Sequence, residues 1–66
     1  MTIGERIRKA RKAKGISQLC LAMRCDMCYQ SRISVLERGV KSPTLRTIEI
    51  LARELGVTAD WLINGE

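Results

Sequence analysis

The chain has 66 residues, the size of one small domain, 1–66, with a single small core. It carries 12 Lys and Arg against 7 Asp and Glu, a formal net charge of +5, and no His. This size leaves little room for an enzyme pocket, and the commonest general base and metal ligand is missing. The sequence also lacks glycine-rich phosphate loops and paired-carboxylate motifs. We therefore expect a non-enzyme that needs no cofactor, metal or small-molecule ligand.

The charge is unevenly distributed along the chain. Residues 1–46 hold 11 basic and 3 acidic side chains (11 − 3 = +8), whereas residues 47–66 hold 1 basic and 4 acidic (1 − 4 = −3). A basic body suits a face that binds an anionic polymer, although solvated charged helices would show the same balance. No apolar run approaches the ~18 residues of a membrane span, and a signal-peptide core is missing. These features predict a cytoplasmic protein with no membrane contact.

Apolar residues at helical spacing, without strict alternation, predict an all-α protein. The first helix is expected over residues 3–14. Thr2 is its N-cap, Glu5 completes a capping box, and Gly15 ends the helix. Its inward stripe is Ile3, Ile7 and Ala10.

The next two helices are predicted to form a helix-turn-helix over residues 17–39. Ser17 caps the second helix, a break falls in residues 26–29, and the third helix covers residues 30–38 before Gly39. The inward positions of the second helix are Leu21, Ala22 and Cys25.

The third helix is laid out like a probe of DNA. Gln30, Ser31 and Arg32 stand at its start with Val35 one turn on, whereas Ile33 and Leu36 fall on the opposite, apolar face. Gln, Ser and Arg at the N-terminal end of an exposed helix are side chains that hydrogen-bond base edges in the major groove. The pattern therefore indicates a recognition helix.

Two further helices complete the expected domain. Thr44 caps a helix over residues 45–55, and Thr58 caps a short one over residues 59–63. The inward side chains of the fourth helix are expected to be Leu45, Ile48, Leu51, Ala52 and Leu55.

Four segments carry a family resemblance, and they are, in order, GERIRKARKAKGISQ, SRISVLERG, SPTLRTIEILARELGV and ADWLINGE. Through them, nearly the whole chain resembles the lambda-repressor/Cro family of helix-turn-helix (XRE-type) regulators. The resemblance implies a compact five-helix domain with the helix-turn-helix at helices 2 and 3. It also implies a phage or bacterial repressor-like transcriptional regulator. Such a protein binds a palindromic operator in double-stranded DNA as a homodimer, with its recognition helix in the major groove.

The resemblance implies roles for individual residues. The base-reading set is Gln30, Ser31, Arg32 and Val35, with Arg32 open to a phosphate contact instead and Val35 to the edge of the core. The backbone set is Gln18, Arg38, Lys41 and Thr44, of which the last three could also contact the adjacent minor groove, and Gln18 is also expected to hold the start of the recognition helix. Tyr29 is added to this set because it adjoins the altered turn.

Two other sets follow from the resemblance. Arg11 and Glu37 match an ion pair joining the first helix to the end of the third, or else form a weak surface contact. Dimer contacts are expected from Trp61, Leu62 and Ile63, although Trp61 also suits the core.

The turn departs from the family pattern. Asp26 or Met27 stands where the family has Gly, and one extra residue falls within residues 26–29. Asp tolerates a left-handed backbone better than most residues, so Asp26 can replace Gly. The extra residue leaves Tyr29 open to a capping, phosphate or base contact.

Two rival functions remain open. Leu19, Met23, Met27 and Tyr29 could form an apolar patch of an antitoxin-like interaction module that also binds DNA. The three cysteines, Cys20, Cys25 and Cys28, include a C-x-x-C that could bind zinc or act as a redox switch. That signal is weak, because a structural zinc site wants four well-spaced ligands.

Overall fold

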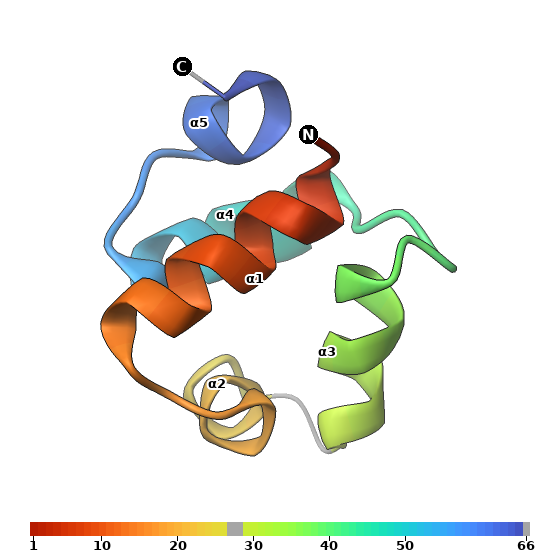
Figure 1. Ribbon diagram of the computed structural model, residues 1–66, viewed down its shortest axis with the longest axis vertical. Coiled ribbons are helices and arrows are strands. Elements are labelled where there is room, and N and C mark those ends of the chain that lie inside the picture. Colours follow the sequence, from red (N-terminus) through yellow and green to blue (C-terminus); the bar gives the residue numbers. More distant parts are fainter. Residues whose placement is uncertain (27–28, 66) are drawn as a thin grey trace.

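The computed structural model describes residues 1–26 and 29–65, and in this part of the chain it has five helices and no strand. The all-α prediction is confirmed. None of these helices is long and apolar enough to cross a bilayer. In chain order they are α1 (Ile3–Lys14), α2 (Gln18–Arg24), α3 (Gln30–Glu37), α4 (Leu45–Leu55) and α5 (Ala59–Asn64), arranged as in Figure 1.

The predicted N-caps place the starts of α1, α2, α4 and α5. In each, the hydroxyl of the residue before the helix accepts a hydrogen bond from the backbone N–H three residues on, which satisfies a donor that the helix leaves unpaired. The Thr2–Glu5 capping box is complete, with bonds of 3.0 and 3.1 Å. The four capping residues are Thr2, Ser17, Thr44 and Thr58.

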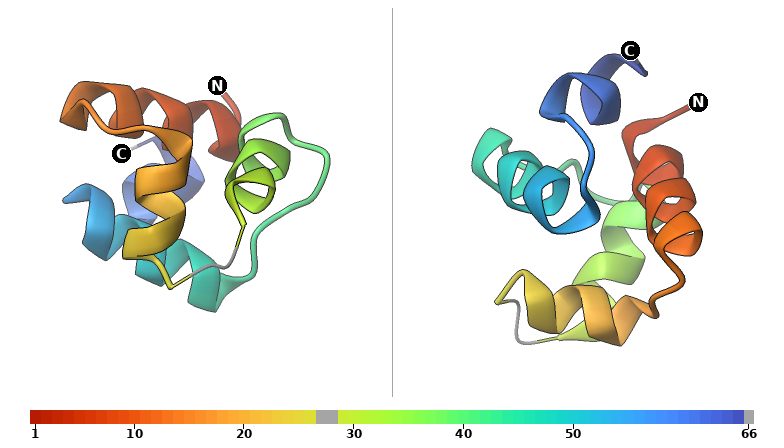
Figure 2. Two further views of the ribbon diagram at one scale, coloured as in Figure 1. Left: turned by 90° about the horizontal axis from the view of Figure 1, so that it is seen from below. Right: turned by 90° about the vertical axis from the view of Figure 1, so that its left-hand side faces the viewer.

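All five helices contribute to one core. Each provides one large side chain with no exposed surface, and these are Ile7, Leu21, Ile33, Leu51 and Leu62. α1 packs against α3, α4 and α5, while α2 and α3 lie together at the end of the molecule opposite α5 (Figures 1 and 2). The core therefore fixes α3 from its inner side and leaves its outer side in solvent.

Several sequence predictions are wrong in detail. Leu45 is 63% exposed rather than inward, because it is the first residue of α4 and its side chain leans back beyond the packed turns. Leu62 is fully buried, so the core occupies this proposed dimer contact. α3 stops at Glu37, one residue earlier than predicted, and α5 extends one residue further, to Asn64.

A close backbone contact between α1 and α3 depends on Gly4. This residue is buried, and a Cβ atom added to it would lie 2.4 Å from the carbonyl oxygen of Leu36 and 2.6 Å from that of Glu37. These distances are far below van der Waals contact, so only glycine allows α1 to approach the end of α3 so closely. Nothing in the sequence around Gly4 marks it as a contact position.

A second unpredicted contact ties α5 to α1. The Arg6 guanidinium donates hydrogen bonds from Nη1 to the carbonyl oxygens of Leu62 and Ile63, both at 3.0 Å. Carbonyls in the last turn of a helix lack intrahelical partners and carry the negative end of its dipole. A cation is thus well placed there, and it fixes the short α5 against the N-terminal half of α1.

Gly4→Ala tests the contact between α1 and α3. Helix propensity alone favours alanine by about 1 kcal/mol, but the clash with two carbonyl oxygens requires α1 and α3 to separate. We expect a net loss of about 1–3 kcal/mol in the free energy of unfolding, as for other overpacked sites. Urea unfolding followed by circular dichroism measures it.

The matched control is Ala13→Gly at an exposed position of the same helix. It should cost about 1 kcal/mol through propensity alone. A Gly4→Ala variant more stable than the parent would contradict the close approach.

Candidate nucleic-acid interface

The turn between α2 and α3 uses Asp26 where glycine is usual. Asp26 has φ = +56°, the positive φ that a left-handed turn requires, and this confirms the predicted replacement. Cys25, which precedes it, is the C-cap residue of α2 and is buried. The predictions for Met27 and Cys28 fall outside the described residues.

The two faces of α3 differ as predicted. Ile33 and Leu36 are buried in the core, whereas Gln30, Ser31 and Arg32 are exposed. Val35 is half-buried and keeps part of its apolar surface toward solvent. The N-terminal turn of α3 therefore offers polar side chains to a ligand approaching from solvent.

A shielded ion pair joins α1 to the end of α3. Arg11 donates from Nε to Glu37 Oε2 at 2.7 Å and from Nη2 to Glu37 Oε1 at 3.2 Å. Its remaining Nη1 bonds the carbonyl oxygen of Ile16 at 2.9 Å. The two side chains are only 11% and 4% exposed, so this predicted pair is confirmed and is not a weak surface contact.

Gln18 carries this network on to the start of α3. Its Nε2 donates to Glu37 Oε1 at 3.2 Å, and its Oε1 accepts from Gln30 Nε2 at 3.2 Å. The expectation that Gln18 holds the start of the recognition helix is confirmed. Its contact with a DNA phosphate stays a prediction. We call the four side chains Arg11, Glu37, Gln18 and Gln30 the polar chain.

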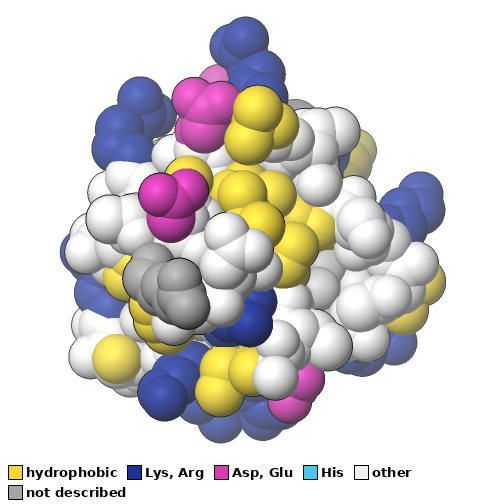
Figure 3. Space-filling view, turned by 90° about the horizontal axis from the view of Figure 1, so that it is seen from above, with side chains coloured by type: hydrophobic (Ala, Val, Ile, Leu, Met, Phe, Trp, Pro, Cys, Tyr) yellow, Lys and Arg dark blue, Asp and Glu magenta, His cyan; other side chains and the backbone are white. Residues whose placement is uncertain are grey.

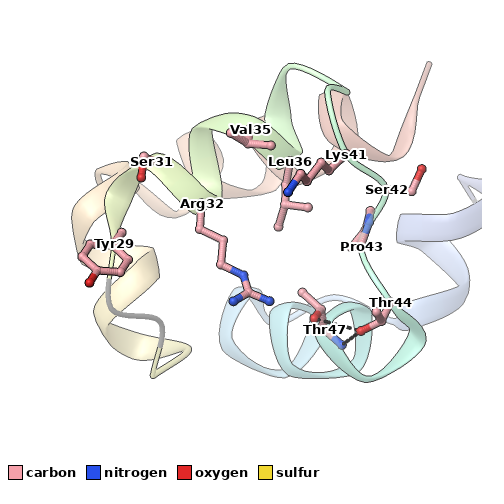
Figure 4. A pocket seen from close by; sticks show the side chains of 10 residues that line it. All are labelled: Tyr29, Ser31, Arg32, Val35, Leu36, Lys41, Ser42, Pro43, Thr44 and Thr47. Atoms are coloured by element: carbon pink, nitrogen blue, oxygen red, sulfur yellow. Dashed lines mark hydrogen bonds between the residues drawn. The ribbon is translucent and has the colours of Figure 1, made fainter.

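A groove of about 420 Å³ runs between α3, the following loop and the first turn of α4 (Figure 4). It brings together residues from both predicted DNA-contact sets, since Arg32 and Val35 line it with Lys41 and Thr44. Tyr29 stands at one end of it, 70% exposed and with no capping bond from its side chain. Its other lining residues are Ser31, Leu36, Ser42, Pro43 and Thr47.

Two of the residues predicted to contact the DNA backbone lie outside this groove. Arg38 is exposed beyond the end of α3, where its Nε donates to the carbonyl oxygen of Ser34 at 3.4 Å. Gln18 lies at the start of α2 within the polar chain. Ser42 and Thr47 were missed by the sequence analysis, although the serine before Pro43 and the threonine three residues after Thr44 are polar loop and capping signals.

The cysteines show no metal-binding arrangement within residues 1–26 and 29–65, where no group of three His, Cys, Asp or Glu side chains could hold an ion. Cys25 is buried, and burial raises the pKa of its thiol to about 11, with a smaller contribution from the charge of Glu54. A thiol of this kind is a poor nucleophile and a poor metal ligand at neutral pH. Cys20 is half-buried on α2.

The fold and this interface define a helix-turn-helix domain of the lambda-repressor type. A helix-turn-helix family model (HTH_3) matches residues 7–62, and the chain belongs to this family. It is 32% identical over 66 residues to the immunity repressor protein of Bacillus phage phi105, covering 100% of this chain and 45% of that protein. It is 36% identical over 65 residues to the control protein C.BamHI of Bacillus amyloliquefaciens, covering 97% and 79%.

Solved structures with the same fold support this family membership. The P22 c2 repressor, crystallised with a synthetic operator, superposes with a TM-score of 0.92 and 30% identity, covering 100% of this chain and 98% of that one. The chain thus spans less than half of the phi105 repressor but almost all of the P22 chain.

Glu37→Ala tests the polar chain. It leaves the shielded Arg11 guanidinium without its carboxylate, and removing one partner of a buried pair costs about 3–5 kcal/mol. We expect a loss of that size in the free energy of unfolding, measured by urea titration.

The control is Arg11→Met/Glu37→Met, which removes both charges and fills similar volume. It should recover more than half of the loss, because no isolated charge remains. If the free energy of unfolding of Glu37→Ala lay within about 0.5 kcal/mol of the parent value, the pair would be solvated and not shielded.

Cys25 reactivity tests its burial. In a Cys20→Ser/Cys28→Ser variant, a pKa of about 11 keeps the Cys25 thiol protonated at pH 8, whereas an ordinary thiol is partly ionised there. We expect disulfide-reagent labelling at pH 8 to be more than about 100-fold slower in the folded protein than in urea, and to accelerate up to about pH 11. Equal rates in both states would contradict this environment.

Proposed function

We propose that this protein is a sequence-specific regulator of transcription that binds double-stranded DNA and is not an enzyme. The observation that carries the proposal is the placement of α3. Its apolar side is locked into the core through Ile33 and Leu36, while Gln30 and Ser31 stand exposed at its first turn. A rigid helix that presents hydrogen-bonding side chains at its N-terminal end fits the major groove.

The surroundings of α3 suit a DNA backbone. Lys41 and Thr44 line the groove beside it, and Arg38 stands exposed just beyond its end. Cations and hydroxyls beside a recognition helix bind phosphates and so set the register of the helix on the duplex. Solved structures of the P22 c2 repressor with a synthetic operator and of SinR with DNA, the latter with a TM-score of 0.85, support this role.

A homodimer on a palindromic operator follows from the limited reach of one recognition helix. Two copies spaced about one helical turn apart read two half-sites. The face that carries α5 shows a contiguous area of hydrophobic side chains with charged groups around it (Figure 3). Trp61 and Ile63 of α5 are half-buried and remain the dimer contacts that we propose, whereas Leu62 belongs to the core.

The rival reading as an antitoxin-like interaction module has less support. Leu19 and Met23 are 50% and 70% exposed on α2 and border a shallow hollow with Cys20. Tyr29 lines the groove beside α3, not that hollow. Of the four residues expected to form one patch, Leu19 and Met23 thus border one hollow and Tyr29 another, and Met27 lies outside the described residues.

Selection of binding sites from random duplex DNA, at two salt concentrations, tests the proposal. We expect an enriched palindrome with half-site centres about 10 bp apart. Gln30→Ala should relax the preference at one position of each half-site, by about 1–3 kcal/mol. Binding that falls steeply with salt and enriches no sequence would mean that the basic surface only binds phosphates, and the regulator proposal would fail.

A further inference from the structure

Arg32 extends from the first turn of α3 toward α4 (Figure 4). In Figure 4 its side chain extends across the groove toward Thr47 in the first turn of α4, while the shorter Ser31 lines the same groove from α3. Arg32 also lines a second hollow, which continues the groove past Asp26 and Arg46. Its guanidinium therefore stands between α3 and α4.

The groove around Arg32 is cationic and lined with hydroxyls. Lys41 contributes a second cation at the loop, and Arg46 a third in the adjoining hollow. Ser42, Thr44 and Thr47 add hydroxyl groups on the same walls. Among residues 1–26 and 29–65 the ion pairs are Arg11–Glu37 and Arg53–Glu54, so no described carboxylate forms an ion pair with Arg32, although Asp26 lines the adjoining hollow.

A groove of this shape and charge fits a sugar-phosphate strand better than the edge of a base pair. A strand carries one negative charge for each nucleotide, and a guanidinium binds phosphate oxygens through paired N–H donors. The first turn of α4 adds the positive end of a helix dipole to the same wall. These features act on any sequence equally, because phosphates are identical along DNA.

We infer that Arg32 is a phosphate-binding positioning residue that seats one DNA strand between α3 and α4, and that base discrimination rests with Gln30, Ser31 and Val35. This inference rests on the proposed function. The sequence left Arg32 open to a base contact or a phosphate contact, and this inference selects the phosphate contact. Arg32 then holds α3 in register, while its neighbours select the sequence.

The test compares Arg32→Ala, Arg32→Lys and Gln30→Ala on the selected operator and on operators changed one base pair at a time, each over a range of salt. For Arg32→Ala we expect affinity to fall about tenfold near 0.1 M salt, equally for all operators, and the salt slope to drop by about 1. Arg32→Lys should keep most of that slope. Gln30→Ala is the matched control and should change base preference while leaving the slope intact.

Two results would overturn the inference. One is an Arg32→Ala protein that loses its preference at a single base pair. The other is an Arg32→Ala protein with unchanged affinity and slope. Circular dichroism and urea unfolding of each variant check that the fold is kept, as expected at an exposed position. If the parent protein selects no operator at all, the proposed function fails instead.

Discussion

The shielded carboxylate of Glu37 is the constraint on which the arrangement of the DNA-facing surface depends. It lies at the last turn of α3, accepts two hydrogen bonds from Arg11 of α1 and a third from Gln18 of α2, and is 4% exposed. A charge so far removed from water is stable only while its partners stay in place. Any rotation or shift of α3 against α1 and α2 would therefore break hydrogen bonds that water cannot replace there. Apolar packing of Ile33 and Leu36 is less directional, so the polar chain sets the orientation of the helix more narrowly than the core does.

The same network links stability to recognition. Gln18 holds Gln30 by a bond of 3.2 Å, so the first exposed residue of α3 is oriented before any DNA arrives. Pre-orientation lowers the entropy lost by a side chain on binding. On the other side, Gly4 lets the backbone of α1 approach the end of α3, close to Glu37 itself. The helix is thus clamped at its C-terminal end by α1 and tied at its N-terminal end through α2, with its remaining surface free for a ligand.

Much of the fold could be predicted because its signals are local. A hydroxyl at Thr2, Ser17, Thr44 or Thr58 bonds an N–H only three residues away, and Gly15 and Gly56 adopt positive φ at the ends of their helices. The positive φ of Asp26 could be predicted for the same reason, because the tolerance of Asp for a left-handed backbone depends on its own side chain and not on distant contacts. The position of α3 and the inward side chains Ile33 and Leu36 followed from helical spacing.

Contacts between distant segments could not be predicted in this way. Arg6 bonds carbonyls 56 and 57 residues along the chain, and nothing in its neighbourhood distinguishes it from the other basic residues of α1. Gly4 reads as an ordinary weak helix residue until α3 is placed beside it. Leu45 was misjudged because periodicity gives a helix face but not where the neighbouring helices end, and Leu62 because the resemblance does not show which apolar residues of the C-terminal helix the core buries. The direction of Arg32 depends on the groove that the loop and α4 form, which exists only in the folded chain.

The most direct test of the central claim is a double-mutant cycle between Gln18 and Gln30, measured as operator affinity of Gln18→Ala, Gln30→Ala and the double variant. If Gln18 orients Gln30, the two losses are not additive and the coupling energy is about 0.5–1.5 kcal/mol. Losses that add within about 0.3 kcal/mol would show that Gln30 acts independently, and the polar chain would then stabilise the fold without setting the orientation of the recognition helix.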